Sequence, residues 1–147
     1  MNTYAENRKA LFDYEMLEKY YAGIVLTGQE VKSIKNGRMN LAGSFVVQQN
    51  GEIFLLNASV PPYQPNNTPE TYDPKRTRKL LLKKSEIKEL IGKFHQKGLT
   101  LIPLKVYNDR NKIKVEFAIA KGKRKIDKRE KIKKREAERE IRRALKI

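Results

Sequence analysis

Three clusters of Lys and Arg side chains could bind phosphate groups. Phosphate binding needs hydrogen-bond donors that carry a positive charge, and both residue types supply them. The clusters are Arg8 with Lys9, the run KRTRK at residues 75–79, and KGKR at residues 121–124. If the fold brings these segments together, they form a basic surface for a polyanion.

The whole chain is strongly basic. Of its 147 residues, 33 are Lys or Arg and 17 are Asp or Glu, which gives a formal net charge of +16. Such a charge concentrates polyanions near the surface, so nucleic acid is the first partner to consider. No apolar run approaches the roughly 20 residues of a membrane-spanning helix, and no secretory signal is visible at the N-terminus. We therefore expect a cytoplasmic protein with no membrane partner and no small-molecule substrate.

Enzyme chemistry has little support in the sequence. The chain has no Cys and only one His, His95, which excludes Cys-based metal sites, a thiol nucleophile and an all-His zinc centre within one chain. The carboxylates lack a spacing that suggests a two-metal nuclease, and residues 122–124 lack the other residues of a P-loop. We predict a non-enzyme without metal or cofactor, and keep a metal-dependent nuclease as a distant alternative.

The elements that must position the basic clusters are mainly strands. Short apolar runs separated by turn residues are typical of a sandwich or barrel. Asn50-Gly51 predicts a type I′ hairpin turn, and Pro103 predicts an edge, a bulge or a corner. The predicted strands cover residues 22–31, 44–49, 52–57, 78–82, 100–107 and 112–120. This pattern indicates a small β-barrel of about six strands.

Few helices are expected. The clearest runs through KKSEIKELIGKFHQKG, with Ser85 as N-cap and Gly98 as terminator. A shorter helix is predicted over residues 13–20, and a further turn after Glu30 that ends at Asn36-Gly37. Residues 60–74 contain too many Pro and Asn residues for a helix or a central strand, so we expect a long loop there.

The last 27 residues differ from the body. Residues 121–147 contain 14 basic and 5 acidic residues, and from residue 123 onward they lack Pro and Gly. Their helical propensity is high, but the apolar stripe is thin. We predict a barrel domain at 1–120 and a basic tail at 121–147 that is disordered when free and helical when bound to an anionic partner. The alternative is an exposed, solvated helix without a partner.

Several strings, in this order, resemble the family of small protein B, also called SsrA-binding protein. They are ENRKALFDYE, AGIVLTGQEVKSIKNG, NLAGSFV, DPKRTRKLLL, GLTLIPLKVY and AKGKRKIDKRE, and the resemblance extends from Glu6 to the C-terminus. It implies an OB-like barrel that binds the transfer-RNA-like domain of transfer-messenger RNA. It also implies a tail that senses the empty messenger channel beyond the small-subunit decoding centre of a stalled ribosome, in trans-translation. A ribosomal protein or general RNA chaperone with an OB barrel is the alternative.

The basic clusters and the resemblance together define the candidate binding residues. For RNA binding they are Asn7, Arg8, Lys9, Tyr21, Lys32, Arg76, Arg78, Lys79, Leu81, Lys83, Lys121, Lys123 and Arg124. For the decoding centre and messenger channel they are Ile126, Asp127, Lys128, Arg129, Lys133, Lys134, Arg135, Arg139, Arg142 and Arg143.

The chain departs from the family pattern at three positions. Phe12 stands where the family often has His, Tyr21 where it commonly has Glu, and Ile126 where an aromatic residue or His is frequent. A tyrosine can stack, donate and accept hydrogen bonds, but it offers no carboxylate acceptor. The RNA contact at position 21 is therefore expected to differ.

Overall fold

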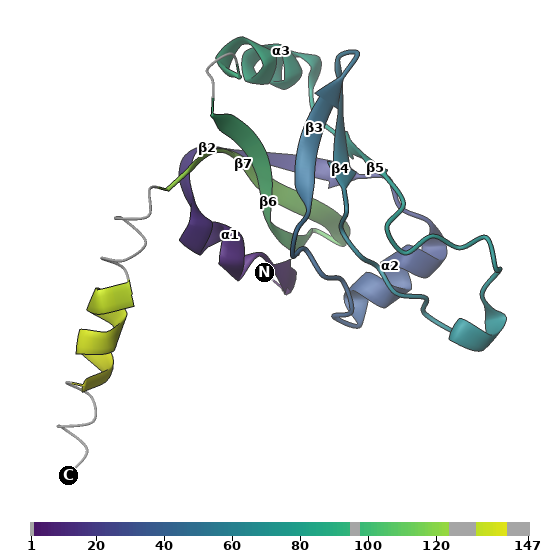
Figure 1. Cartoon of the computed structure of the whole chain (residues 1–147). Coiled ribbons are helices and arrows are strands. Elements are labelled where there is room, and N and C mark those ends of the chain that lie inside the picture. Colours follow the sequence, from purple (N-terminus) through teal and green to yellow (C-terminus); the bar gives the residue numbers. More distant parts are fainter. Residues whose placement is uncertain (1, 95–97, 124–131, 141–147) are drawn as a thin grey trace.

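The computed structural model describes residues 2–94, 98–123 and 132–140 (Figure 1). Residues 132–140 form a separate helical segment. The other elements are β1 (Thr3–Glu6), α1 (Arg8–Asp13), β2 (Tyr14–Ile24), α2 (Gly28–Lys35), β3 (Phe45–Gln49), β4 (Glu52–Leu56), the 3-10 turn η1 (Pro65–Asn67), β5 (Arg78–Leu81), α3 (Lys84–Lys93), β6 (Leu99–Asp109) and β7 (Lys112–Gly122).

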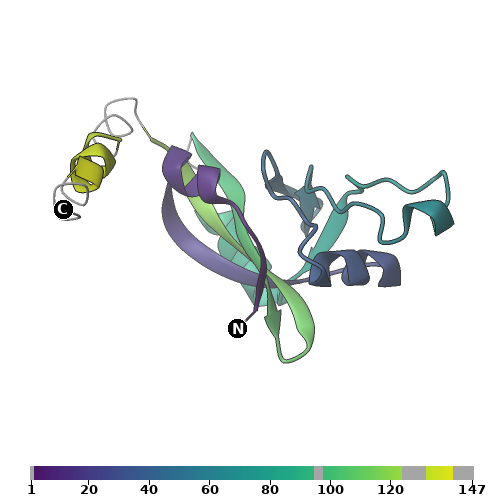
Figure 2. The same cartoon turned by 90° about the horizontal axis from the view of Figure 1, so that it is seen from below.

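The strands close into a barrel. Their order is β1-β6-β3-β4-β5-β2-β7, and an additional pairing of β6 with β7 completes a ring of six strands. Strand β1, which the sequence did not predict, pairs with β6 beside this ring. Figure 2 shows β2, β6 and β7 as one curved layer, with β3 to β5 and α2 on the other side. The predicted mainly β class with about six barrel strands is confirmed.

Strand β7 has an inner and an outer side. Val115 and Phe117 lie in the main core, where the Phe117 ring stacks on Tyr20 at a centroid distance of 5.6 Å. Ala118 and Ala120 point to the opposite side, where they pack against Ala10 of α1. We call this side of β2, β6 and β7 the outer face. Helix α1 covers one end of it.

The predicted turns are confirmed. Asn50 and Gly51, with φ of 53° and 75°, join β3 to β4 in the left-handed region that a type I′ turn requires. Helix α2 ends at Lys35, and its C-cap Asn36 is followed by Gly37 at φ 73°. The ladder between β6 and β7 shifts register between Pro103 and Lys105, as the proline predicted.

The helix predicted over residues 13–20 is wrong. Residues 14–24 form β2, and the helix in this region is α1, which ends at Asp13. The strand pairs with β7 over almost its whole length, with a bulge between Met16 and Glu18. Burial nevertheless alternates from Tyr14 to Ala22, but the exposed positions include Leu17 and Tyr21, so apolar residues do not follow a regular period of two in the sequence.

The strand predicted over residues 22–31 is only partly right. The strand ends at Ile24, and α2 begins at Gly28. Thr27 caps this helix in a capping box, in which the Glu30 amide donates to Thr27 Oγ1 at 3.3 Å and the Thr27 amide donates to Glu30 Oε1 at 2.9 Å. These paired hydrogen bonds favour a helical start over continuation of the strand.

Helix α3 is confirmed, but its predicted ends are not. The N-cap is Lys83 rather than Ser85, and the Lys83 amide donates to the Glu86 carboxylate at 3.2 Å. The helix ends at Lys93, before Gly98, which adopts φ 82° ahead of β6. The predicted loop over residues 60–74 has no regular element except η1.

The described part of the tail is helical at residues 132–140, in agreement with the predicted propensity. Strand β7 continues to Gly122. The division at residue 120 and the disorder of the free tail stay predictions, and residues 124–131 and 141–147 lie outside the described residues. None of the helices within residues 2–94, 98–123 and 132–140 has the length and apolar character needed to cross a membrane.

Candidate nucleic-acid interface

Asn7 holds α1 against the barrel. Its Nδ2 donates to the Pro103 carbonyl at 3.0 Å, and its Oδ1 accepts from the Ala10 amide at 3.3 Å, which caps the helix. The side chain is buried. Its neighbours Arg8 and Lys9 are exposed, with Arg8 Nε 3.5 Å from the Glu6 carboxylate. Asn7 therefore positions this basic pair and presents little surface of its own.

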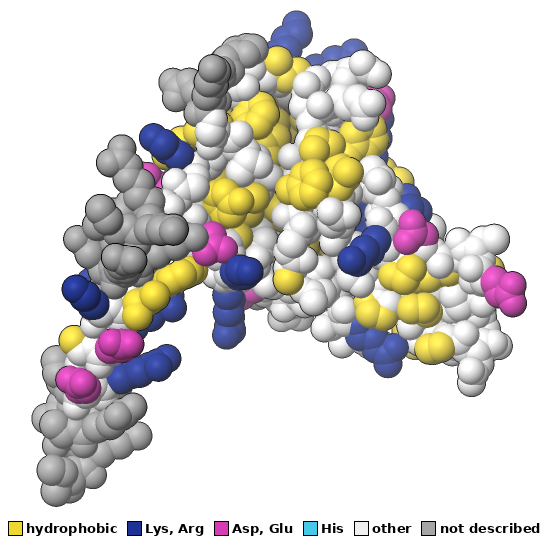
Figure 3. Space-filling view, in the orientation of Figure 1, with side chains coloured by type: hydrophobic (Ala, Val, Ile, Leu, Met, Phe, Trp, Pro, Cys, Tyr) yellow, Lys and Arg dark blue, Asp and Glu magenta, His cyan; other side chains and the backbone are white. Residues whose placement is uncertain are grey.

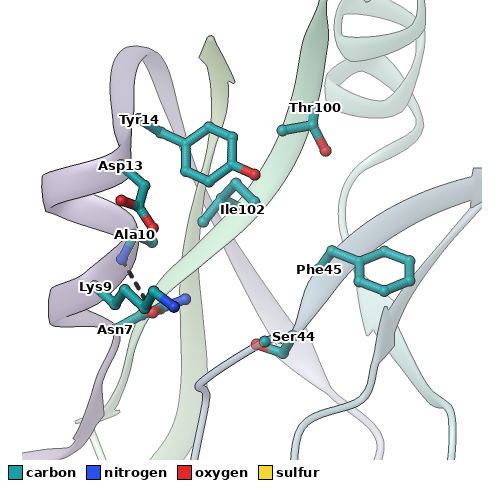
Figure 4. A pocket seen from close by; sticks show the side chains of 10 residues that line it. Asn7, Lys9, Ala10, Asp13, Tyr14, Ser44, Phe45, Thr100 and Ile102 are labelled. Carbon is teal, nitrogen blue, oxygen red and sulfur yellow. Dashed lines mark hydrogen bonds between the residues drawn. The ribbon is translucent and has the colours of Figure 1, made fainter. Parts of the chain in front are cut away.

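A cavity of about 330 Å³ lies between α1, the start of β3 and β6. In Figure 4 the side chains of Tyr14 and Ile102 lie on one side of it and Phe45 on the other, with Lys9 and Asp13 at the α1 wall. Aromatic surface beside a basic residue is a combination suited to a nucleobase and its phosphate.

The end of β7 lies beside the end of α1. The Lys123 amide donates to the Asp13 carbonyl at 2.9 Å, and Lys123 Nζ donates to the Leu11 carbonyl at 3.2 Å. Lys121, two residues earlier, is exposed. The structure thus places the third predicted basic cluster at the end of α1, the helix that begins with the first cluster, where the tail leaves the barrel.

The prediction that Arg78, in the second cluster, binds RNA is corrected by the structure, because this side chain is not exposed to an RNA ligand. It is fully buried, and the five N–H groups of a guanidinium are all used within the protein. Nε donates to Glu30 Oε2 at 2.7 Å, Nη1 to the carbonyls of Ala58 and Arg76 at 3.0 and 2.9 Å, and Nη2 to the Pro74 carbonyl at 3.0 Å and to Glu30. Its role is structural.

Arg76 shares the same carboxylate. Its Nη2 lies 2.6 Å from Glu30 Oε1 and 3.2 Å from the Val25 carbonyl, while its side chain remains partly exposed. Burial alone would raise the pKa of the Glu30 carboxyl, but hydrogen bonds from Arg76 and the Thr27 amide, and the charge of Arg78, lower it overall. Arg76 is therefore only partly available to a ligand.

The remaining residues of β5 alternate. Leu80 is buried in the core, whereas Lys79 and Leu81 point outward. Lys79 Nζ lies 3.4 Å from Glu52. Lys83, two residues beyond Leu81, is exposed.

Tyr21 and Leu81 share the outer face. Gly23 pairs with Leu81, and a Cβ at Gly23 would lie 3.4 Å from the Leu81 Cβ. Tyr21 precedes Gly23 by two residues on β2 and therefore points to the same side. Both Tyr21 and Leu81 are 52% exposed, and they offer neighbouring apolar surface that suits contact with a partner.

Lys32 lies on α2, away from the outer face. It is exposed, and its Nζ lies 5.6 Å from the centroid of the Tyr63 ring, in the long loop. On the face seen in Figure 3, basic side chains are dispersed over the barrel and the described part of the tail rather than gathered in one patch.

Four predicted tail residues fall within the helical segment 132–140, and all are exposed: Lys133, Lys134, Arg135 and Arg139. The Arg135 guanidinium lies 5.3 Å from the centroid of the Phe12 ring, a cation–π contact between tail and barrel. The other candidates, Arg124, Ile126, Asp127, Lys128, Arg129, Arg142 and Arg143, lie outside the described residues.

Sequence reasoning missed a charged group on the outer face. Glu116 lies between Lys19 and Lys105, with each of its carboxylate oxygens 3.8 Å from one lysine Nζ. The alternation of KIKVEFAIA around Val115 and Phe117 was the available signal, since it places Glu116 opposite the core.

Comparison with known proteins gives a consistent result. The model of the family described as "SmpB protein" matches residues 4–147. An "SsrA-binding protein" of Carboxydothermus hydrogenoformans is 55% identical over 96% of this chain and 94% of its own length, and one of Halothermothrix orenii is 52% identical over 97% and 91%. A solved chain described as "tmRNA-SmpB: a journey to the center of the bacterial ribosome" matches with a TM-score of 0.67 and 47% identity, covering 86% of this chain and 92% of its own. The chain belongs to the SmpB protein family.

Proposed function

We propose that this chain binds the transfer-RNA-like domain of transfer-messenger RNA and delivers it to stalled ribosomes for trans-translation. The observation that carries the proposal is the match over nearly the full length, at about 50% identity, to proteins named for binding SsrA. The solved relative named together with transfer-messenger RNA and the ribosome points the same way. The ribosome and this RNA place the activity in the cytoplasm.

The barrel supplies the RNA-binding part of this function. Exposed cations lie at the start of α1, at Arg8 and Lys9, and near the end of β7, at Lys121. Exposed apolar surface lies on the outer face, at Tyr21 and Leu81. Cations bind the RNA backbone irrespective of sequence, while aromatic and apolar side chains can contact unstacked bases. The role is binding, without bond chemistry.

The tail supplies ribosome selection. Its basic helix would follow the messenger path beyond the decoding centre only when that path is empty, because intact message would occupy the same space. The exposed cations of residues 132–140, Lys133, Lys134, Arg135 and Arg139, would contact ribosomal RNA there. Asp127, Lys128 and Arg129 would lie nearer the decoding centre.

Removing the tail separates these two parts. In a chain that ends at Lys125, we expect RNA binding to be largely retained and tagging of nascent chains on stalled ribosomes to be lost. Tagging at the full level by the shortened chain would contradict the role of the tail. Equal sedimentation with stalled and translating ribosomes, independent of transfer-messenger RNA, would instead favour a constitutive ribosomal protein.

A further inference from the structure

Glu116 occupies the centre of the outer face. On β7 it pairs with Tyr21 of β2 on one side and with Lys105 of β6 on the other. Directly paired residues of neighbouring strands project to the same side of the sheet. Tyr21 points outward, so the Glu116 carboxylate lies on that side next to the tyrosine ring.

The Glu116 side chain is mostly buried, and its carboxylate accepts no short hydrogen bond from the described part of the chain. Only 8% of the Glu116 side chain is exposed, and both of its lysine contacts, at 3.8 Å, are too long for hydrogen bonds. Among the residues that the structure describes, none donates a hydrogen bond to it. The carboxylate oxygens are not among the described side-chain atoms that are fully buried without a hydrogen-bond partner. Glu116 therefore presents acceptor oxygens at the surface that a ligand can reach.

The groups around Glu116 suit RNA. The side chains of Lys19 and Lys105 are 54% and 33% exposed, so their ammonium groups can turn toward phosphates. Lys105 Nζ lies 5.6 Å from the centroid of the Tyr107 ring. Burial, then the charges of Asp109 and Glu116, raise the pKa of Tyr107, so this ring stays neutral.

We infer that Glu116 accepts hydrogen bonds from neutral donors of the bound RNA, ribose 2′-hydroxyls or base amino groups, while Lys19 and Lys105 contact the flanking phosphates. This inference rests on the proposed function and extends it to a residue outside the basic clusters. It also bears on the departure from the family pattern at Tyr21. The carboxylate that the family commonly has at this position is supplied here by Glu116, which pairs with Tyr21 across the ladder.

The test depends on whether RNA binding becomes weaker or tighter when the charge of Glu116 is removed. A merely structural Glu116 would be an unfavourable negative charge near RNA, so Glu116→Gln would leave binding of a transcript of the transfer-RNA-like domain unchanged or tighter. If Glu116 accepts from the RNA, the same change lowers affinity about tenfold or more at constant salt. Asp109→Asn is the matched control, since it removes a carboxylate 3.5 Å from Lys114 on the same hairpin. Binding by this control should not weaken.

A second variant tests the position of the acceptor. Tyr21→Glu placed in the Glu116→Gln chain returns a carboxylate to the paired position and should recover part of the lost affinity. Thermal melting of every variant establishes that the barrel is folded. The titrations would then be repeated with RNA that carries 2′-deoxy sugars in the nucleotides that the bound protein shields from chemical probing. If the donors are 2′-hydroxyls, Glu116→Gln no longer lowers the affinity for this RNA. If the donors are base amino groups, the loss of affinity persists.

Two results would overturn the claims separately. Binding by Glu116→Gln at or above the level of the unchanged chain would remove Glu116 from RNA recognition while leaving the proposed function intact. Failure of the unchanged chain to prefer this RNA over elongator transfer RNA would overturn the proposed function, and this inference with it.

Discussion

The carboxylate of Glu30 and the guanidinium of Arg78 meet across 48 residues of sequence with 2.7 Å between Arg78 Nε and Glu30 Oε2. Both side chains are almost completely buried, at 1% and 0% exposure. Glu30 also closes the capping box of α2 and binds Arg76. One carboxylate thus joins α2, β5 and the end of the long loop, which explains why Arg78, in the basic segment KRTRK, is held inside the fold.

Removing Arg78 should destabilise the barrel strongly. Arg78→Ala would leave Glu30 as a buried charge without its main partner, and we expect a loss of about 3–5 kcal/mol in the free energy of unfolding measured in urea. Arg78→Lys should also be severe, because an ammonium cannot reproduce the five N–H donors. Arg8→Ala, at a side chain that is 89% exposed, is the control and should cost almost nothing. Equal stability of the Arg78 and Arg8 variants would refute the structural role of Arg78.

The same network makes stability depend on pH. The pKa of Glu30 is lower in the folded chain than its ordinary value of 4.5, so its ionised form stabilises the fold. This stabilisation is fully present above pH 4.5 and is lost as the pH falls through the folded pKa. Urea unfolding between pH 7 and pH 3 should therefore show falling stability, and Glu30→Gln, less stable at neutral pH, should show a shallower fall. An identical slope in both chains would exclude Glu30 as a cause.

Substitution of Asn7 should lower the stability of the fold rather than remove a direct contact with RNA. Asn7→Ala removes both the cap of α1 and the hydrogen bond to Pro103, so we expect a loss of about 1–3 kcal/mol. Asn7→Asp keeps the acceptor that caps α1 but loses the donor to Pro103, so its stability should lie between those of the unchanged chain and Asn7→Ala. If Asn7→Ala left the melting temperature unchanged and abolished RNA binding, direct contact would replace positioning as the explanation.

Exposed lysines should contribute to the affinity for RNA through counterion release. Lys9→Ala and Lys121→Ala should each weaken binding to all RNAs and reduce the slope of log K against log salt by about 1. Neither should change the melting temperature, because both side chains are exposed. A loss of affinity without any change of the salt slope would show that these lysines do not bind phosphate.

Local signals in the sequence predicted much of the fold. Asn50-Gly51, Asn36-Gly37 and Pro103 each impose a backbone geometry that does not depend on distant residues, and each was located correctly. Most of strand β2 could not be located, because apolar residues at its exposed positions Leu17 and Tyr21 hide the alternation and its hydrogen bonds come from β7, about 100 residues away.

The candidate site was predicted less completely than the fold. Residue type identified the cations, but burial decides which of them can meet RNA, and burial depends on tertiary contacts. Arg78 and Lys79 are neighbours in sequence, yet one is buried by Glu30 and the other is exposed. Glu116 was missed for a different reason. The alternation of its strand indicates that its side chain points away from the core, but only the ladder shows that it lies between two lysines.

The most direct test of the account is a comparison of three RNAs over a series of salt concentrations. The purified chain would be titrated with transfer-messenger RNA, elongator transfer RNA and an unrelated folded RNA of equal length. Recognition of the transfer-RNA-like domain by the barrel predicts tight binding of the first RNA at salt concentrations where the other two no longer bind. If all three weaken together along one steep slope, the affinity is counterion release alone, and specific recognition of transfer-messenger RNA is contradicted.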